Sequence, residues 1–219
     1  MSGTPLHYEA LSDMKLAGVC GPMVYEVSNS ELIDMGHSTP PIVNLVKLPN
    51  VDYDEELDWQ AAYRKFIADN VIRNLKVAEL AHKHRQQGHA VVIMTNWIEH
   101  ADKINQLLSE QCIYLSGQLS PNEIVTGMEQ FRQSGGILLC TPVLSEGVNL
   151  PNIDVLILAA GGKSHISLLQ RLGRGMRKAD GKNQLIVYDF IDNGNKYVFN
   201  HSRKRYAVYK EQGFKVTII

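Results

Sequence analysis

Short apolar runs alternate with amphipathic helical patterns from about residue 90 to the end of the chain. The predicted strands are Ala90–Thr95, Ile113–Leu115, Ile137–Thr141, Val155–Ala159, Leu185–Phe190 and Phe214–Ile218. The predicted helices are Ile98–Leu108, Pro121–Gln133, Ser164–Arg177 and about Lys196–Gln212. Apolar strands without polar alternation are typical of parallel sheets that are covered on both faces. The pattern predicts a doubly wound parallel α/β domain, with ligands at the carboxyl ends of its strands.

The first 88 residues follow a different pattern. Gly21–Ser28 and Pro41–Leu48 are expected to be extended, with a short helix between them. One long helix is predicted from about Trp59 to Gln87, and its expected buried stripe comprises Ile67, Val71, Leu75 and Ala78. We therefore expect residues 1–88 to form a linker and a lead-in helix, and residues 89–219 to form the α/β domain.

Composition excludes several classes of protein. No run of about 18 apolar residues is present, so we expect no membrane span. The N-terminus lacks the basic and apolar regions of a signal peptide, which favours the cytoplasm. Cys20, Cys112 and Cys140 form no CxxC motif, which argues against a disulfide scaffold or a zinc site, and no metal site is predicted. The net charge is −1, so any contact with nucleic acid must be local.

The strongest chemical signal is the run Gln170-Arg-Leu-Gly-Arg-Gly-Met-Arg177, which follows a predicted strand. Arg171, Arg174 and Arg177 recur every three residues and share one face of the predicted helix. The alternative is a solvated basic face, the usual location of a charge run. Gly173 and Gly175 weigh against that alternative, because each costs a helix about 1 kcal/mol relative to alanine. Glycines between arginines indicate that a ligand approaches the backbone closely.

This run resembles motif VI of superfamily 2 helicases, Q-R-x-G-R-x-x-R. Four other segments resemble helicase motifs in the same order: the tail of motif III, motif IV, the segment after it, and motif V. They are Ser2–Pro5, Val92–Asn96 with His100, Leu115–Gln118, and Thr141–Pro151. The resemblance covers nearly the whole chain and implies the C-terminal RecA-like domain of such a helicase. The tail from Tyr188 to Phe214 resembles that of UvsW-type phage helicases, relatives of XPB and RadD helicases that act on branched DNA.

The resemblance implies a role for each matched residue. Arg174 and Arg177 match the arginine fingers, whose guanidinium groups stabilise the charge on a γ-phosphate during its transfer. Four further positions match residues that face ATP: Gly147, Asn149, Gln170 and Arg171. Five others match positions that hold the backbone of a nucleic acid: Thr95, Asn96, Gly117, Gln118 and Thr141. For Thr95, Asn96 and Thr141, capping of a loop is the alternative interpretation.

The phosphate-binding half of the ATP site is absent from the sequence. No G-x-x-x-x-G-K-[S/T] motif and no DExH or DEAD box occurs in the 219 residues. We therefore expect ATP and Mg²⁺ to be bound mainly by a first RecA-like domain of the same polypeptide, and DNA to be the partner of both domains. The isolated chain is predicted to be inactive, and it resembles a piece of a longer helicase.

Two other functions are retained as alternatives. Gly162-Lys163-Ser164 follows a predicted strand, as the end of a P-loop does, so the chain is alternatively a stand-alone NTPase. The first glycine of such a loop would fall at Ile157, inside the strand, which weighs against it. A non-catalytic module that binds nucleic acid or protein is the other alternative. Asp189 and Asp192 are expected to cap a turn or face solvent, and Trp59 and Trp97 are expected to be packing residues.

Overall fold

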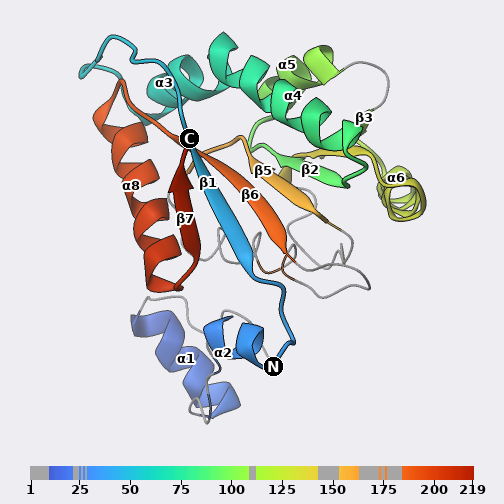
Figure 1. Cartoon of the computed structure of the whole chain (residues 1–219). Helices are drawn as coiled ribbons and strands as arrows, with labels where there is room; N and C mark the ends of the chain where they lie inside the picture. Colours follow the sequence, from blue (N-terminus) through green and yellow to red (C-terminus); the bar gives the residue numbers. More distant parts are fainter. Residues whose placement is uncertain are drawn as a thin grey trace.

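The computed structural model describes residues 10–21, 25, 27, 29–108, 112–142, 153–162, 173, 176 and 184–219. Its centre is a seven-stranded sheet in the order β3-β4-β2-β5-β6-β1-β7, in which neighbouring strands pair in parallel (Figure 1). The strands are β1 (Pro41–Lys47), β2 (Val91–Met94), β3 (Cys112–Leu115), β4 (Ile137–Cys140), β5 (Val155–Leu158), β6 (Leu185–Ile191) and β7 (Lys215–Ile218). The predicted parallel α/β sheet is confirmed.

Helices cover both faces of the sheet (Figure 1). The four long helices that pack on it are α4 (Val71–Gln86), α5 (Ile98–Leu108), α6 (Pro121–Ser134) and α8 (Lys196–Glu211). Along β2, Val91 and Ile93 are in one core cluster with Ile104 of α5. Val92 points to the opposite face, into a cluster with Met128 of α6. Every residue of β2, β4 and β5 is buried, which explains why these strands are apolar throughout.

The prediction of a single helix from Trp59 to Gln87 is wrong. The chain forms α3 (Trp59–Tyr63), a π-helix η1 (Arg64–Ala68) and then α4. Asn70 lies between them in an extended conformation, and its side chain accepts the N–H of Arg73 at 3.0 Å as the N-cap of α4. Its amide nitrogen donates to the carbonyl of Phe66 at 3.2 Å. An asparagine that bonds its own backbone in this way competes with a continuous helix and ends it.

The predicted apolar stripe is only half correct, because the helix on which it was predicted is broken. Ile67 and Ala78 are buried, but Val71 is 66% and Leu75 is 51% exposed. The break at Asn70 changes the phase of the helix. Arg73 and Asn74 therefore turn inward, with 0% and 4% exposure. A sequence pattern that expects charged residues outside cannot anticipate this arrangement, because it depends on partners from other elements.

Strand β1 lies within the sheet, between β6 and β7. Its residues were expected to be extended, which they are, but they were assigned to a linker. Because β1 pairs with β6 along its full length, from Pro41 with Leu185 to Lys47 with Ile191, the expected boundary between residues 88 and 89 does not coincide with the edge of the sheet. The first half of the chain contributes a structural strand.

Other expectations can be followed element by element. Helix α6 confirms the helix predicted at Pro121–Gln133, and it begins with a capping box in which Ser120 accepts the N–H of Glu123 and Glu123 accepts that of Ser120. Two helices precede β1: α1 (Ala10–Cys20) and α2 (Asn29–Asp34), and the second is the predicted short helix. Ser2–Pro5, most of Ser164–Arg177 and residues 143–151 of Thr141–Pro151 lie outside the described residues. Within the described part of the chain, no helix is both long and apolar enough to cross a membrane.

Candidate functional site

Polar residues follow three neighbouring strands at one edge of the sheet. Strands β3 and β2 both pair with β4, and the last residue of each, Leu115 and Met94, lies opposite Cys140. Two backbone hydrogen bonds extend this register beyond the strands. The N–H of Thr141 donates to the carbonyl of Leu115 at 3.1 Å, and that of Thr95 donates to Cys140 at 3.0 Å. Because these strands are parallel, their carboxyl ends meet and bring the loops together.

The five nucleic-acid candidates lie just beyond the carboxyl ends of β2, β3 and β4. Gly117 and Gln118 are exposed and Asn96 is half-buried. Thr95 and Thr141 are buried, with 1% and 5% exposure. The hydroxyl of Thr95 lies 3.4 Å from the carbonyl of Cys140, so its side chain holds the loop. For Thr95, the described contacts fit the loop-capping alternative.

A turn of two glycines follows β5 at the same edge. Gly161 and Gly162 have φ of +63° and +100°, a region that other residues rarely adopt. The N–H of Ala160 donates to the carbonyl of Met94 at 3.2 Å, which joins the ends of β5 and β2. A Cβ atom on Gly162 would lie 3.6 Å from the amide nitrogen of Asn96. The glycine turn is therefore beside the loop that carries two of the candidates.

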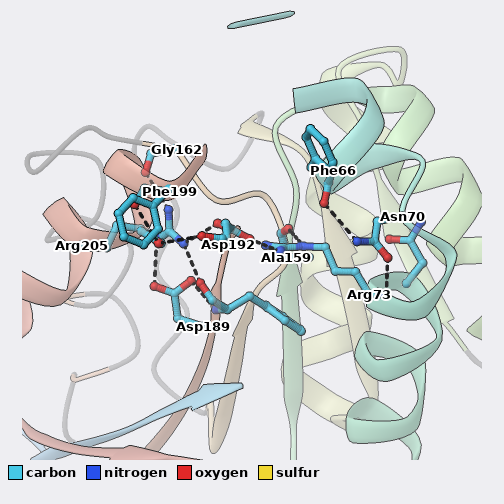
Figure 2. Close-up of polar contacts among 12 residues, drawn as sticks. Phe66, Asn70, Arg73, Ala159, Gly162, Asp189, Asp192, Phe199 and Arg205 are labelled. Carbon is cyan, nitrogen blue, oxygen red and sulfur yellow. Dashed lines mark hydrogen bonds and ion pairs between the residues drawn. The ribbon is translucent and has the colours of Figure 1, made fainter. Parts of the chain in front are cut away.

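A buried ion network lies beneath this turn (Figure 2). Asp192 shares its two oxygens between Arg73 of α4 and Arg205 of α8, the second at 3.0 Å. Arg205 also binds Asp189 through Nε at 2.8 Å, and the hydroxyl of Tyr209 donates to Asp189 at 2.6 Å. The four charged side chains are between 0% and 4% exposed. Two guanidinium groups and two carboxylates balance in charge, which makes their burial tolerable.

The network also holds the backbone at the carboxyl ends of two strands. Arg73 donates from Nε to the carbonyl of Ala159 at 3.0 Å. Arg205 donates to the carbonyl of Gly162 at 2.9 Å and to that of Phe190 at 3.0 Å. Burial disfavours the Arg205 cation, but Asp189 and Asp192 outweigh it and raise its pKa, so the residue stays charged. Helices α4 and α8 are thereby tied to the ends of β5 and β6.

The expectation that Asp189 and Asp192 cap a turn or face solvent is wrong. Both are buried, with 1% and 4% exposure, and both bind Arg205. The sequence offers one weak signal, because Arg205 and Tyr209 are four residues apart on a helix and so share a face. The partners Arg73 and Asp192 are 119 residues apart, and no local pattern connects them.

The residues expected to face ATP cannot be placed. Arg174, Arg177, Gln170, Arg171, Gly147 and Asn149 all lie outside the described residues. Two neighbours are described: Gly173 is exposed, and Met176 is 1% exposed in the core. The carbonyl of Met176 accepts the N–H of Thr39 at 2.7 Å. Met176 is therefore joined to the segment that leads into β1.

The glycine turn after β5 differs from a site that holds ATP phosphates and Mg²⁺. Among the described residues, no group of three or more His, Cys, Asp or Glu side chains is arranged to hold a metal ion. Ile157, at the position where a P-loop needs its first glycine, lies inside β5 and pairs with Ile93 and Tyr188. The carbonyl of Gly162 is taken by Arg205. The glycine turn therefore lacks the wide loop that wraps phosphates in a P-loop.

His100, which follows the motif IV candidates, is a buried structural residue. It is 0% exposed and its Nε2 lies 2.9 Å from the side-chain oxygen of Asn74. Its Nδ1 has no hydrogen-bond partner in the part of the chain that is described. Burial, followed by the nearby charges of Arg73 and Lys103, lowers its pKa from 6.5 to about 3, and Asp69 opposes this shift. His100 is therefore neutral in the folded protein at pH 7.

We expect this histidine to make stability depend on pH. Its folded pKa is below that of the unfolded chain, so its contribution is complete above about pH 6.5 and declines as the pH falls towards 3. The decline is up to about 1.4 kcal/mol per pH unit. The variant His100→Gln keeps a donor for Asn74 and does not titrate, so urea unfolding between pH 7 and 4 should show a flatter profile. The exposed His37→Gln serves as control; equal slopes for wild type and His100→Gln would contradict this assignment.

Comparisons with known proteins agree with the helicase resemblance and with the fold. The model of the helicase conserved C-terminal domain matches residues 70–179. The ATP-dependent DNA helicase UvsW of Enterobacteria phage T4 is 29% identical over 211 residues, which are 89% of this chain and 40% of the relative. A putative ATP-dependent RNA helicase of Methanocaldococcus jannaschii is 28% identical over 141 residues, 60% of this chain and 17% of the relative. The chain thus spans less than half of these relatives.

Two solved structures share the fold. The crystal structure of T4 UvsW matches with a TM-score of 0.68 and 23% identity, covering 83% of this chain and 41% of that one. A fragment of a putative HsdR subunit of a type I restriction enzyme from Vibrio vulnificus matches with a TM-score of 0.73 and 18% identity, covering 100% and 43%. With the family model over half of its residues, this chain belongs to the helicase conserved C-terminal domain family, as the C-terminal RecA-like domain of a superfamily 2 helicase.

Proposed function

We propose that this chain is the second motor domain of an ATP-dependent helicase that acts on DNA. In this proposal, Arg174 and Arg177 complete an ATP site whose phosphate-binding half, with Mg²⁺, is on a first RecA-like domain. Closing and opening of the cleft between the domains moves them along the strand. The observation that carries the proposal is the joint presence of a motif VI run after β5 and polar loops from three strands at one edge, without a phosphate-binding loop.

DNA is the proposed nucleic acid. The curated DNA helicase of phage T4 aligns with 89% of this chain, whereas the archaeal RNA helicase aligns with 60%. Because it covers 89% of the chain, the longer match extends beyond residue 179, where the family model ends. We propose branched DNA in recombination or repair as the substrate, by likeness to that phage tail. Unwinding of a forked DNA by the complete helicase, compared with an RNA fork of the same sequence, tests this choice.

The proposed contacts with the strand come from the exposed part of the loop edge. Gly117 and Gln118 offer exposed backbone and amide groups, and Asn96 offers a half-buried amide. Such groups suit phosphate oxygens, which position a strand without reading its sequence. Thr95 and Thr141 are buried and would act by shaping the loops. A net charge of −1 fits a grip made of few local contacts.

A stand-alone NTPase is the second candidate, and its prediction differs. If our proposal holds, the purified 219-residue chain does not hydrolyse ATP, with or without DNA, because the phosphates and Mg²⁺ lack their main ligands. Steady-state hydrolysis assays check this, with the polypeptide that carries both RecA-like domains, called the two-domain polypeptide below, as positive control. DNA-stimulated hydrolysis by the chain alone that Lys163→Ala abolishes would establish the NTPase instead.

The third candidate is a binding module without catalysis. The near-neutral charge argues against it, because non-specific binding of nucleic acid depends on many basic side chains. Fluorescence anisotropy of a labelled DNA strand at low salt tests it directly. The module would be favoured if this chain alone bound DNA tightly and the two-domain polypeptide were inactive.

A further inference from the structure

We propose that Arg205 is a positioning residue of the ATP site: it holds the glycine turn from which the arginine-bearing segment departs. This inference rests on the proposed function, because the connection that begins at the turn carries Arg174 in the sequence. Gly162 precedes Lys163, and Gln170 to Arg177 follow within the same connection between β5 and β6. The place where that connection begins is set by the contacts of Gly161 and Gly162.

The guanidinium group of Arg205 fixes this place relative to β6. It donates to the carbonyl of Gly162 at 2.9 Å, and simultaneously to Asp189, Asp192 and the carbonyl of Phe190 at 2.8 to 3.0 Å (Figure 2). The planar fork of an arginine presents these donors in a fixed geometry. Four acceptors from β6, its end and the turn are therefore held by one rigid group.

Packing leaves the turn little freedom to move. A Cβ atom on Gly161 would lie 2.9 Å from the Cδ1 of Ile67 and 3.4 Å from a carboxylate oxygen of Asp192. Ile67 belongs to η1, and Arg73 of α4 holds the carbonyl of Ala159, just before the turn, at 3.0 Å. Elements on both sides of the turn thus define its position.

The turn also adjoins the proposed nucleic-acid edge. The space beside Gly162 is bordered by the amide of Asn96 at 3.6 Å from the Cβ position. The ends of β5 and β2 are joined by the hydrogen bond from Ala160 to Met94. The turn lies beside the loop for the strand and directly precedes, in the sequence, the segment that carries Arg174, which is the right place to make hydrolysis respond to DNA.

Stability alone does not explain why this contact is ionic. A buried ion pair is no better for stability than well-packed apolar residues of the same volume. The second terminal nitrogen of Arg73 is buried without a hydrogen-bond partner among the described residues, so the network is not fully satisfied. The ionic network instead fixes the position of the backbone, because its guanidinium groups bind particular carbonyls at the ends of β5 and β6 and in the turn.

The test uses the two-domain polypeptide with Arg205→Lys, which keeps the charge and loses the fork. We expect kcat for DNA-stimulated ATP hydrolysis to fall by about 10²-fold, as when reacting groups are misplaced by about 1 Å, with the KM for ATP changed less than about threefold. Val208→Ala is the matched control, because Val208 is buried on the same helix but packs in the core, outside the network. It should lower Tm and leave kcat within about twofold.

A second pair of variants keeps the test decisive if Arg205→Lys does not fold. Gly162→Ala strains the turn at φ +100°, with its Cβ only in ordinary contact with Asn96. Gly88→Ala imposes a similar strain at φ +84°, at a position with no atom within 4 Å of the added Cβ. At equal loss of Tm, Gly162→Ala should lower kcat and the degree of DNA stimulation, and Gly88→Ala should lower neither.

The outcomes separate this inference from the function on which it rests. If Arg174→Ala abolishes turnover but Arg205→Lys and Gly162→Ala behave like their controls, Arg205 is a structural residue and the inference is overturned. If Arg174→Ala also turns over normally, the proposed function fails, and the positioning role fails with it. If kcat falls for Arg205→Lys and Gly162→Ala but not for their control variants, the result supports both the proposed function and the positioning role.

Discussion

Replacing Arg174 by Ala in the two-domain polypeptide is expected to lower kcat for ATP hydrolysis by about 10³-fold or more, the range seen when arginine fingers are withheld. The binding of ATP should change much less, because the charge that the guanidinium stabilises develops in the transition state. The same expectation holds for Arg177. Steady-state kinetics and a fluorescent-nucleotide titration on the same preparations measure the two effects separately.

Matched substitutions make this prediction specific. Arg174→Lys should restore little activity, since lysine lacks the planar fork that meets two phosphate oxygens. Arg203→Ala removes an exposed arginine of α8 that stacks on Phe199, and it should leave kcat within about twofold. If nucleotide binding fell as far as turnover in Arg174→Ala, the residue would be a ground-state binder. If neither changed, motif VI would have a structural role here.

The largest expected loss of stability follows from Asp192→Asn. Asp192 is shared between Arg73 and Arg205, so its loss leaves two buried guanidinium groups with one carboxylate. Breaking a buried pair in this way costs about 3–5 kcal/mol of the free energy of unfolding. That loss is a large part of the roughly 5–15 kcal/mol by which folded domains are typically stable. Urea unfolding followed by circular dichroism measures the loss.

An exposed ion pair provides the comparison for Asp192. Asp69 pairs with Lys103, and their side chains are 43% and 41% exposed. Asp69→Asn makes the same chemical change and should cost no more than about 1 kcal/mol. A loss for Asp192→Asn no greater than that of Asp69→Asn would mean that the network at the ends of β5 and β6 is not a main determinant of stability.

The sequence predicted those parts of the molecule that depend on local patterns. Strands β2, β4 and β5 are apolar at every position because both faces of the sheet are covered, and their runs were recognisable for that reason. The meeting of Gly117 and Thr141 at one edge of the sheet is a consequence of the parallel pairing that the sequence predicted.

The predictions that were wrong concern features that depend on contacts between residues far apart in the sequence. Strand β1 was assigned to a linker because its partners in β6 and β7 come more than 100 residues later in the sequence. Arg73 was not recognised as buried because its carboxylate partner, Asp192, is 119 residues away. The helix from Trp59 was predicted without a break because the effect of Asn70 depends on its own hydrogen bonds to Phe66 and Arg73.

The binding of a transition-state analogue tests the arginine half-site most directly. Mg-ADP with aluminium fluoride imitates a phosphoryl group in transfer, and transition-state analogues bind at least about 10²-fold more tightly than ground-state ligands. Titration of the two-domain polypeptide should show this gain over Mg-ADP for the wild type, and its loss in Arg174→Ala with the affinity for Mg-ADP unchanged. If Arg174→Ala and Arg177→Ala both kept the full gain, this chain would not supply the arginine fingers, and the account would be contradicted.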